Sequence, residues 1–335
     1  MMRCTTTRKL WQILSAGIFM ALAITPAMSN AFELPPRFYL KTLVGANFIP
    51  VLGLSTTGNV NPLDPTLEMV DPNVTIDANI VMAGYSKSFP LFGRAASLAW
   101  LQPMGDISVN GSGPIPDSST SGFGDPFFEF DVNLLGPGPQ YNLADALRYE
   151  PGLSIDLILD LSVPLGEYDN DEMVNIGQNR FWGRIGLPII YQIGDTWAPS
   201  HRTTLEILPA VMIFADNDDS NSAGDTKSTD PGFTIGGHLT HDVSQAIWIS
   251  LDANYYNFGD SKVNGRTING KDFISVGAAI GTNLTNNLQF TVGYHSTIND
   301  NGKNDIELGT FSASLVYYWA DILDGIERRK EAEHH

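Results

Sequence analysis

Apolar and polar residues take turns along most of the chain, in stretches that run from about Phe38 to Trp319. In the clearest stretch, residues 127–135, Phe128, Phe130 and Val132 fall on one face, with Glu129 and Asp131 on the other. Residues 154–164 and 288–295 repeat the pattern. A period of two predicts β-strands that lie between an apolar and a polar environment. Gly, Pro, Asn or Asp clusters, which favour turns, bound most of the stretches.

The alternation predicts a series of twelve strands. They are residues 38–48, 74–86, 94–101, 126–135, 154–163, 181–193, 203–216, 232–242, 246–256, 273–282, 288–297 and 306–319. Most of them exceed the five or six residues that are common in soluble proteins. Tilted strands that cross a membrane need about nine to eleven residues. Strand length therefore favours a membrane-spanning sheet.

The predicted links alternate between long and short. Long polar links follow the first, third, fifth, seventh and ninth strands, whereas the links 87–93, 194–202, 243–245 and 283–287 are shorter. Two links break the rule: 136–153 is long and includes a candidate helical turn at 143–148, and 297–306 is brief. Bacterial barrels have this asymmetry, with long extracellular loops and short periplasmic turns.

These observations predict an all-β fold, a transmembrane antiparallel up-and-down β-barrel of about twelve strands with long extracellular loops and shorter periplasmic turns. Closure would leave no open strand edge, and an even strand number would place both termini in the periplasm. Alternation alone also fits a soluble sandwich, so a soluble periplasmic β-sandwich binding protein stays open as an alternative.

The first 31 residues have the pattern of a secretory signal peptide. Arg3, Arg8 and Lys9 form a positive segment, residues 13–24 are apolar, and small residues precede Phe32, the predicted first residue of the mature chain. The single cysteine, Cys4, lies inside this segment. Residues 32–319 then form the predicted barrel, and residues 320–335 a charged periplasmic tail.

The chain is strongly acidic. Its 37 Asp and Glu residues against 19 Lys and Arg residues give a formal net charge of −18. Such a chain is not expected to bind nucleic acid, since that binding relies on basic side chains that neutralise phosphates. Acidic residues cluster at 169–172 and 216–219, between strands. They favour either loops at a cation-bearing surface or charge that keeps the protein soluble.

If the apolar face of each strand meets lipid, the opposite face lines a lumen. The charged, histidine and tryptophan candidates for the lumen are Lys41, Asp77, Glu129, Asp131, Asp156, Asp160, Trp182, Arg184, Glu206, His238, Asp252 and His295. Charged groups at membrane depth are costly unless they are paired or hydrated. The acid-rich face therefore indicates an internal ion-pair network or a hydrated path that favours cations and neutral solutes.

Catalytic and metal-binding patterns are weak. His201, His238, His241 and His295 have no Gly-x-Ser-x-Gly elbow near them, and their spacing does not suit zinc. We expect no catalytic residue, no metal site and no cofactor. An outer-membrane-embedded hydrolase nevertheless stays open as a second alternative.

Five segments carry a family resemblance that extends over most of the predicted mature chain. They are YSKSFPLFGRAASLAW from Tyr85, SGFGDPFFEFDVNLLGPG from Ser121, VPLGEYDNDEMVNIGQNRFWG from Val163, FADNDD from Phe214 and GGHLTHDVSQAIWISLDANYY from Gly236. In these segments the chain resembles the MetA-pathway phenol-degradation family of outer-membrane transporter-like barrels. The resemblance implies an outer-membrane channel or transporter for small molecules, especially hydrophobic or aromatic ones.

The resemblance also implies a set of pore-mouth residues. Its most recognisable segment places Asn175, Gly177, Asn179 and Arg180 at an extracellular loop that enters a strand, where we expect them to organise the loop over the pore. Phe123, Phe127, Phe181 and Trp182 lie close to the same end and could contact an aromatic solute or pack the loops on the rim. The expected partners are outer-membrane lipid, lipopolysaccharide and a small-molecule solute.

Overall fold

The computed structural model describes residues 35–40, 42–66, 74–111, 113, 115–142, 146, 149–195, 202–298 and 305–320. Its strands are β1 (Ala46–Gly58), β2 (Thr75–Leu91), β3 (Arg94–Asn110), β4 (Ser118–Phe123), β5 (Phe127–Leu135), β6 (Leu153–Ser162), β7 (Trp182–Gly186), β8 (Ile189–Ile193), β9 (Thr203–Phe214), β10 (Lys227–Thr229), β11 (Gly232–Asp242), β12 (Ile247–Asn257), β13 (Ser261–Val263), β14 (Arg266–Ile268), β15 (Asp272–Asn283), β16 (Leu288–Ile298) and β17 (Leu308–Ala320). No helix within these ranges is long and apolar enough to cross a membrane. The expected signal peptide, the charged tail beyond Ala320 and most of the candidate helical turn lie outside the described residues.

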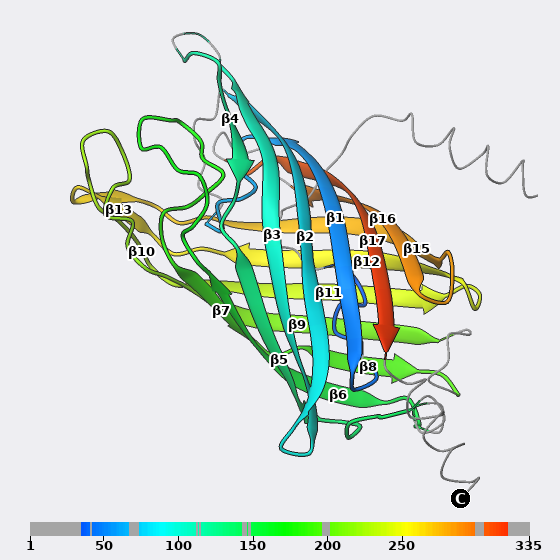
Figure 1. The fold of residues 1–335 in the computed structure, drawn as a ribbon. Coiled ribbons are helices and arrows are strands. Elements are labelled where there is room, and N and C mark those ends of the chain that lie inside the picture. Colours follow the sequence, from blue (N-terminus) through cyan, green and yellow to red (C-terminus); the bar gives the residue numbers. More distant parts are fainter. Residues whose placement is uncertain are drawn as a thin grey trace, which may run out of the picture.

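The main sheet closes into an antiparallel barrel with twelve strand positions. β4 and β5 both pair with β3, one beyond the other, and so act as one interrupted strand. β7 and β8 pair with β6 and β9 in a single register and are interrupted only at Leu187 and Pro188. Pro188 has no N–H to donate, which explains the break. β10, β13 and β14 form a separate small sheet near one end of the barrel (Figure 1).

Pairing of the first strand with the last closes the sheet. β1 and β17 run antiparallel along their whole length, from Ala46 opposite Ala320 to Gly58 opposite Leu308. Closure removes both sheet edges, so every strand has a partner on each side. A single closed barrel also replaces the two packed sheets of the sandwich alternative.

The alternation predicted from the sequence separates the two faces of the barrel wall. On β6, Ile158 is fully buried, whereas Leu159 and Leu161 are 42% and 45% exposed on the outer face. The same outer face carries half-exposed apolar side chains on the other strands: Ile49, Val81, Leu98, Trp100, Phe128, Ile185, Tyr191, Ile207, Val211, Leu239, Ile249, Ile280 and Leu315. An apolar outer band of this kind is where a barrel meets the lipid.

The prediction for the first strand was wrong. The strand covers Ala46–Gly58 and not residues 38–48. Pro50, Gly53 and Ser55 weaken the alternation within the true strand, because Pro cannot complete the ladder and small residues bury little apolar surface. Residues 36–39 form a turn, with Tyr39 buried at 7% exposure.

The long and short connections lie at opposite ends of the barrel, as predicted. β2 and β3 meet in a two-residue turn at Phe92 and Gly93, both with positive φ, the combination that a type I′ hairpin requires. At the other end, β4, β10 and β13 belong to the long loops (Figure 1). By the architecture of outer-membrane barrels, this long-loop end is extracellular and the short-turn end periplasmic.

The barrel interior is filled from both ends. At the extracellular end, Leu63, Val174 and Ile176 of two loops pack against buried side chains of β1, β2 and β3. A second apolar cluster includes Val60 and Phe258 and joins further loops to the inner wall. At the periplasmic end, residues 35–40 lie inside the barrel, where Phe38, Tyr39 and Leu40 pack near Ile158 and Ile190. We call residues 35–40 the N-terminal segment.

We expect a charge on the outer face to destabilise the barrel. Leu159→Lys should cost about 2–4 kcal/mol in lipid if the site lies near the bilayer midplane, since the ammonium would face hydrocarbon. The measurement is the urea midpoint at which the folded, heat-modifiable band disappears in vesicles. Leu165→Lys, in a loop and 74% exposed, is the matched control. Equal midpoints for the two variants would contradict the assignment of the lipid-facing side.

Candidate functional site

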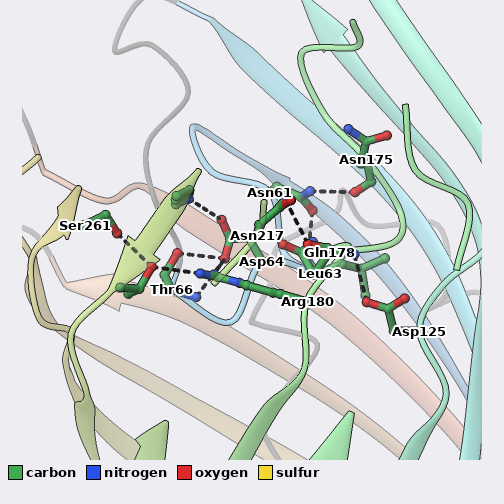
Figure 2. A network of polar contacts seen from close by, with 12 residues as sticks. Asn61, Leu63, Asp64, Thr66, Asp125, Asn175, Gln178, Arg180, Asn217 and Ser261 are labelled. Carbon is green, nitrogen blue, oxygen red and sulfur yellow. Dashed lines mark hydrogen bonds and ion pairs between the residues drawn. The ribbon is translucent and has the colours of Figure 1, made fainter. Parts of the chain in front are cut away.

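Arg180 joins three extracellular loops into a cap over the barrel. It ends the loop between β6 and β7, and its guanidinium donates to Thr229 Oγ1 at 2.7 Å and to Asp64 Oδ1 at 3.4 Å. The same group lies over the ring of Phe214, 5.1 Å from its centroid. Thr229 continues the network to Ser261 at 3.1 Å. Figure 2 shows these side chains converging from separate loops, and we call this network the loop cap.

Asp64 is the anionic centre of the loop cap. Its Oδ1 accepts from the backbone and the hydroxyl of Thr66 at 2.9 and 2.7 Å, and Lys227 lies 3.9 Å from Oδ2. Burial by itself would raise the pKa of Asp64, but Lys227 and Arg180 outweigh it and hold the pKa below its ordinary value. Asp64 therefore stays ionised, and its charge fixes the two cations.

The remaining pore-mouth candidates hold the loop between β6 and β7 in shape. Asn175 accepts from the backbone N–H of Asp169 at 2.8 Å and donates back to its carbonyl at 2.9 Å. Asn179 has a positive φ of 51°, which Asn tolerates better than most residues, and donates to Asn217 at 2.9 Å. These side chains contact other loop groups, as an organising role would require.

Asp125 ties the β4–β5 strand to the same loop. Its carboxylate accepts from the backbone N–H groups of Gly166 and Gln178, both at 2.8 Å. Burial raises the pKa of Asp125, although these N–H groups favour the charged form and oppose the rise. The sequence gave no reason to select Asp125 or Asp64, because each is one acid among many in loop sequence.

A first charged cluster lies on the inner wall. Arg184 Nε lies 2.5 Å from Asp160 Oδ2, and its NH2 group lies 4.0 Å from Glu129 Oε2. The hydroxyl of Tyr39, from the N-terminal segment, donates to Glu129 at 3.4 Å. All four side chains are buried. Glu129, Asp160 and Arg184 are thus brought together inside the barrel, with a residue that the sequence placed on a strand.

A second cluster anchors the N-terminal segment. Arg37 forms an ion pair with Asp242 at 2.5 Å, and its backbone N–H donates to Glu206 Oε1 at 3.0 Å. Its guanidinium lies 4.6 Å from the centroid of the Trp248 ring. Arg202 adds a second cation 3.3 Å from Asp242. Of these residues only Glu206 was among the sequence candidates, because Arg37 lay just before the predicted first strand and gave no signal of its own.

Two histidines share one carboxylate in a third cluster. His238 Nδ1 lies 2.7 Å from Asp252 Oδ1, and His295 Nε2 lies 2.9 Å from Asp252 Oδ2. The hydroxyl of Ser250 donates to the same carboxylate. Strand pairing explains the arrangement, since His238 lies opposite Asp252 in register, and Gly277, which carries no side chain, lies opposite His295. Within the described part of the chain, no group of three or more potential ligands could hold a metal ion.

The other wall candidates have simpler surroundings. Asp156 is fully buried and accepts from Asn133 Nδ2 at 2.7 Å. Asp131 is partly buried and lies on the same strand face as Glu129. Trp182 is buried and packs against Phe127, with 5.6 Å between ring centroids. These placements are inside the barrel or at its inner rim.

Asp77 departs from the expected side of the wall. The buried face of β2 carries Ile76, Ala78 and Ile80, so Asp77 lies on the opposite, outer face. It accepts from Asn110 at 2.8 Å and also bonds to Thr57, both at the loop ends of strands. The loops that fill the barrel here are apolar, and this reverses the usual relation between polarity and face. Lys41 lies outside the described residues.

A cavity separates the N-terminal segment from the loop end of the lumen. It has a volume of about 590 Å³, including space open to solvent, and is lined by Tyr39, Arg184, Glu206, Met212, His238, Asn254 and Tyr256, among others. Its walls thus combine charged clusters, the N-terminal segment and apolar side chains. The lumen is therefore occupied at both ends and hollow between them.

The fold and its surfaces define the class of protein. A closed antiparallel barrel with an apolar outer band, a largely polar inner wall and long loops at one end is the architecture of bacterial outer-membrane proteins. The chain is an outer-membrane β-barrel. It belongs to the family described as "Putative MetA-pathway of phenol degradation", whose model matches residues 46–315.

Solved structures with the same fold include outer-membrane channels. The COG4313 outer membrane channel from Pseudomonas putida F1 is 17% identical, with a TM-score of 0.68 over 86% of this chain and 100% of that chain. The transport unit of the autotransporter AIDA-I from Escherichia coli is 11% identical, with a TM-score of 0.47 over 91% and 97%. The Pseudomonas putida toluene transporter TodX is 7% identical, with a TM-score of 0.36 over 84% and 90%. No curated protein matches the sequence.

We expect Arg180→Lys to loosen the loop cap while leaving the barrel folded. Lys has no planar fork, so it cannot bond Thr229 and Asp64 together, and a lost charged hydrogen bond costs about 1.5–3 kcal/mol. Cleavage of the loops by protease added to intact cells should become faster, with unchanged heat-modifiability. Arg266→Lys, at an exposed position of β14, is the control. Equal cleavage rates in wild type and both variants would show that Arg180 does not hold the loops.

Proposed function

We propose that the protein is an outer-membrane channel for small molecules, in particular hydrophobic or aromatic compounds that the cell degrades. The observation that carries this proposal is the hollow lumen: a closed barrel encloses a cavity of about 590 Å³ between the N-terminal segment and the loop end. Ligand cavities of small molecules have volumes in this range. The phenol-degradation description of the family supports an aromatic solute.

A solute must pass both ends of the lumen. At the periplasmic end the N-terminal segment is held by Arg37, which bonds to Asp242, Thr240 and, through its backbone, Glu206. At the extracellular end the loop cap is held by Arg180 and Asp64. Both closures depend on a few charged contacts and no covalent link. Each can therefore open at a modest free-energy cost, and we propose that they act as the two gates of the path.

The inner wall favours cations and neutral solutes over anions. Buried Glu129, Asp156, Asp160, Glu206 and Asp252 supply acids along the wall. The wall arginine Arg184 is already paired with Asp160. A narrow passage of low dielectric constant focuses the field of the remaining carboxylates on a passing ion. A neutral phenol-like solute meets no such barrier.

A transport role fits the third cluster better than hydrolysis does. Ser250 donates its hydroxyl proton to Asp252, while both histidines also bond to that carboxylate. An activated serine would instead donate to a histidine, which then takes the proton. We therefore propose that Ser250 and the two histidines stabilise the wall and do not form a hydrolytic site.

The proposal includes the ends of the chain and its surroundings. Residues 1–31 are proposed to act as a cleaved signal peptide, and residues 320–335 as a periplasmic tail. Lipid and lipopolysaccharide are proposed to cover the apolar band on the outside of the barrel. Tyr85, Tyr317 and Trp319 support the position of the periplasmic interface, since their rings form a cluster near the strand ends, at 5.7–6.4 Å between centroids.

Removal of the gene tests the proposed substrate class. We expect uptake of labelled phenol at limiting concentration to fall several-fold in the deletion strain, while uptake of a hydrophilic sugar is unchanged. A plasmid-borne copy of the gene should restore phenol uptake. Equal loss of both solutes would indicate a general pore, and no loss of either would refute transport of these compounds.

Release of the N-terminal segment should open the channel. Arg37→Ala removes the Asp242 ion pair and the contact with Trp248, so the closed arrangement should lose about 1.5–3 kcal/mol. In planar bilayers we expect larger or more frequent openings, with a reversal potential that shows cation preference. Lys262→Ala, in an exposed ion pair with Asp230, is the control. Unchanged conductance would show that the segment does not close the path, and anion preference would contradict the proposed wall charge.

A further inference from the structure

The cavity in the lumen has the composition of a ligand site, and not only of a passage. Its apolar wall includes Leu208 and Met212 of β9 and Tyr256 of β12. Tyr39 of the N-terminal segment adds another wall. Small-molecule sites typically combine such apolar walls with a few fixed polar groups. The polar groups of this cavity therefore decide what it can hold.

Gly236 of β11 makes part of the space. It lies in register between Leu208 on β9 and Asn254 on β12. A Cβ atom at Gly236 would lie 3.0 Å from Asn254 Oδ1 and 3.9 Å from Leu208 Cβ. A larger side chain here would fill the hollow between the two neighbours. Gly237, the next residue, lies on the outer face and adds no space to the lumen.

Two buried polar atoms at this cavity have no partner among the described residues. One is Glu206 Oε2, an acceptor on a side chain that is 3% exposed, and the other is Asn254 Nδ2, a donor on a side chain that is 4% exposed. The other carboxylate oxygen of Glu206 is already engaged by the backbone N–H of Arg37. Buried polar atoms are nearly always hydrogen-bonded, so this pair calls for a group that both donates and accepts.

The charges around the cavity select against ions. The free oxygen of Glu206 repels an anion, and the cation nearest to balance it, Arg184, is bonded to Asp160 and close to Glu129. The free N–H of Asn254 repels a cation in turn. A hydroxyl group matches both, since it can donate to Glu206 and accept from Asn254.

We infer that this cavity binds an uncharged small molecule that carries a hydroxyl group on an apolar, ring-sized body. The inference rests on the proposed channel function and adds a binding site, its residues and their roles. Glu206 accepts the hydroxyl proton in a hydrogen bond, Asn254 donates to the hydroxyl oxygen, and Leu208, Met212 and Tyr256 enclose the body. Phenol is the simplest probe of this class.

The first test compares two leucine substitutions on neighbouring glycines. Purified protein in lipid nanodiscs is equilibrated by dialysis against labelled phenol, with binding to empty nanodiscs subtracted. Gly236→Leu should weaken binding at least tenfold because it fills the cavity, whereas Gly237→Leu should bind as wild type does. Equal binding by the two variants would overturn the site.

The second test uses the hydroxyl itself and does not depend on a cavity-filling variant. Anisole, the methyl ether of phenol, can accept from Asn254 but cannot donate to Glu206. Wild type should prefer phenol to anisole at least tenfold, because a site built around a hydroxyl rejects analogues that lack it. Glu206→Gln can turn an N–H into the cavity in place of the free oxygen, so the preference should fall toward one. An unchanged preference in this variant would refute the assigned role of Glu206.

The binding tests are independent of transport. If the purified protein binds phenol with the expected preferences but the deletion strain takes up phenol normally, the site stands and the channel proposal fails. If uptake falls in the deletion strain but wild type shows no phenol binding in nanodiscs, the channel stands and the site is refuted.

Discussion

The backbone of a membrane-spanning protein must satisfy its own hydrogen bonds, and the whole structure depends on how this chain does so. Hydrocarbon offers no partner to an unpaired N–H or carbonyl group, so a sheet in the membrane must close. Here β1 and β17 pair from Ala46–Ala320 to Gly58–Leu308. Closure fixes an inside and an outside, and the period of two then assigns every strand residue to one of them.

The enclosed interior creates a second requirement, since charges inside a narrow barrel need partners. The wall carries more acids than bases, and the N-terminal segment supplies part of the difference. Arg37 pairs with Asp242, and Tyr39 donates to Glu129. The segment is therefore complementary to the wall it covers. The acidic wall of this barrel is understood only when the segment is counted as part of the interior.

The sequence predicted the wall better than its contents. Eleven of the twelve predicted strands correspond to observed strand positions, because long amphipathic strands must alternate whatever fills the barrel. The first strand was missed, since Pro50, Gly53 and Ser55 interrupt its pattern while Phe38 and Leu40 imitate one. Asp77 was assigned to the wrong face because apolar loops fill the barrel beside β2.

The contacts of the site were beyond reach of the sequence for a related reason. Arg37 and Asp242 are 205 residues apart, and Asp64 and Arg180 are 116 apart. No local period links such pairs; only the folding of loops and the N-terminal segment into the lumen brings them together. The residue types were readable as candidates on the strands, whereas the partners on irregular segments gave no pattern to detect.

The cavity and the N-terminal segment share residues, which links occupancy of one to the position of the other. Glu206 binds the backbone of Arg37 through one oxygen and faces the cavity with the other. Tyr39 both lines the cavity and bonds to Glu129 of the charged wall. A molecule in the cavity therefore touches the same side chains that hold the segment closed. If such a molecule favours one position of the segment, the segment in that position must favour the molecule equally, because coupling between two binding equilibria is reciprocal.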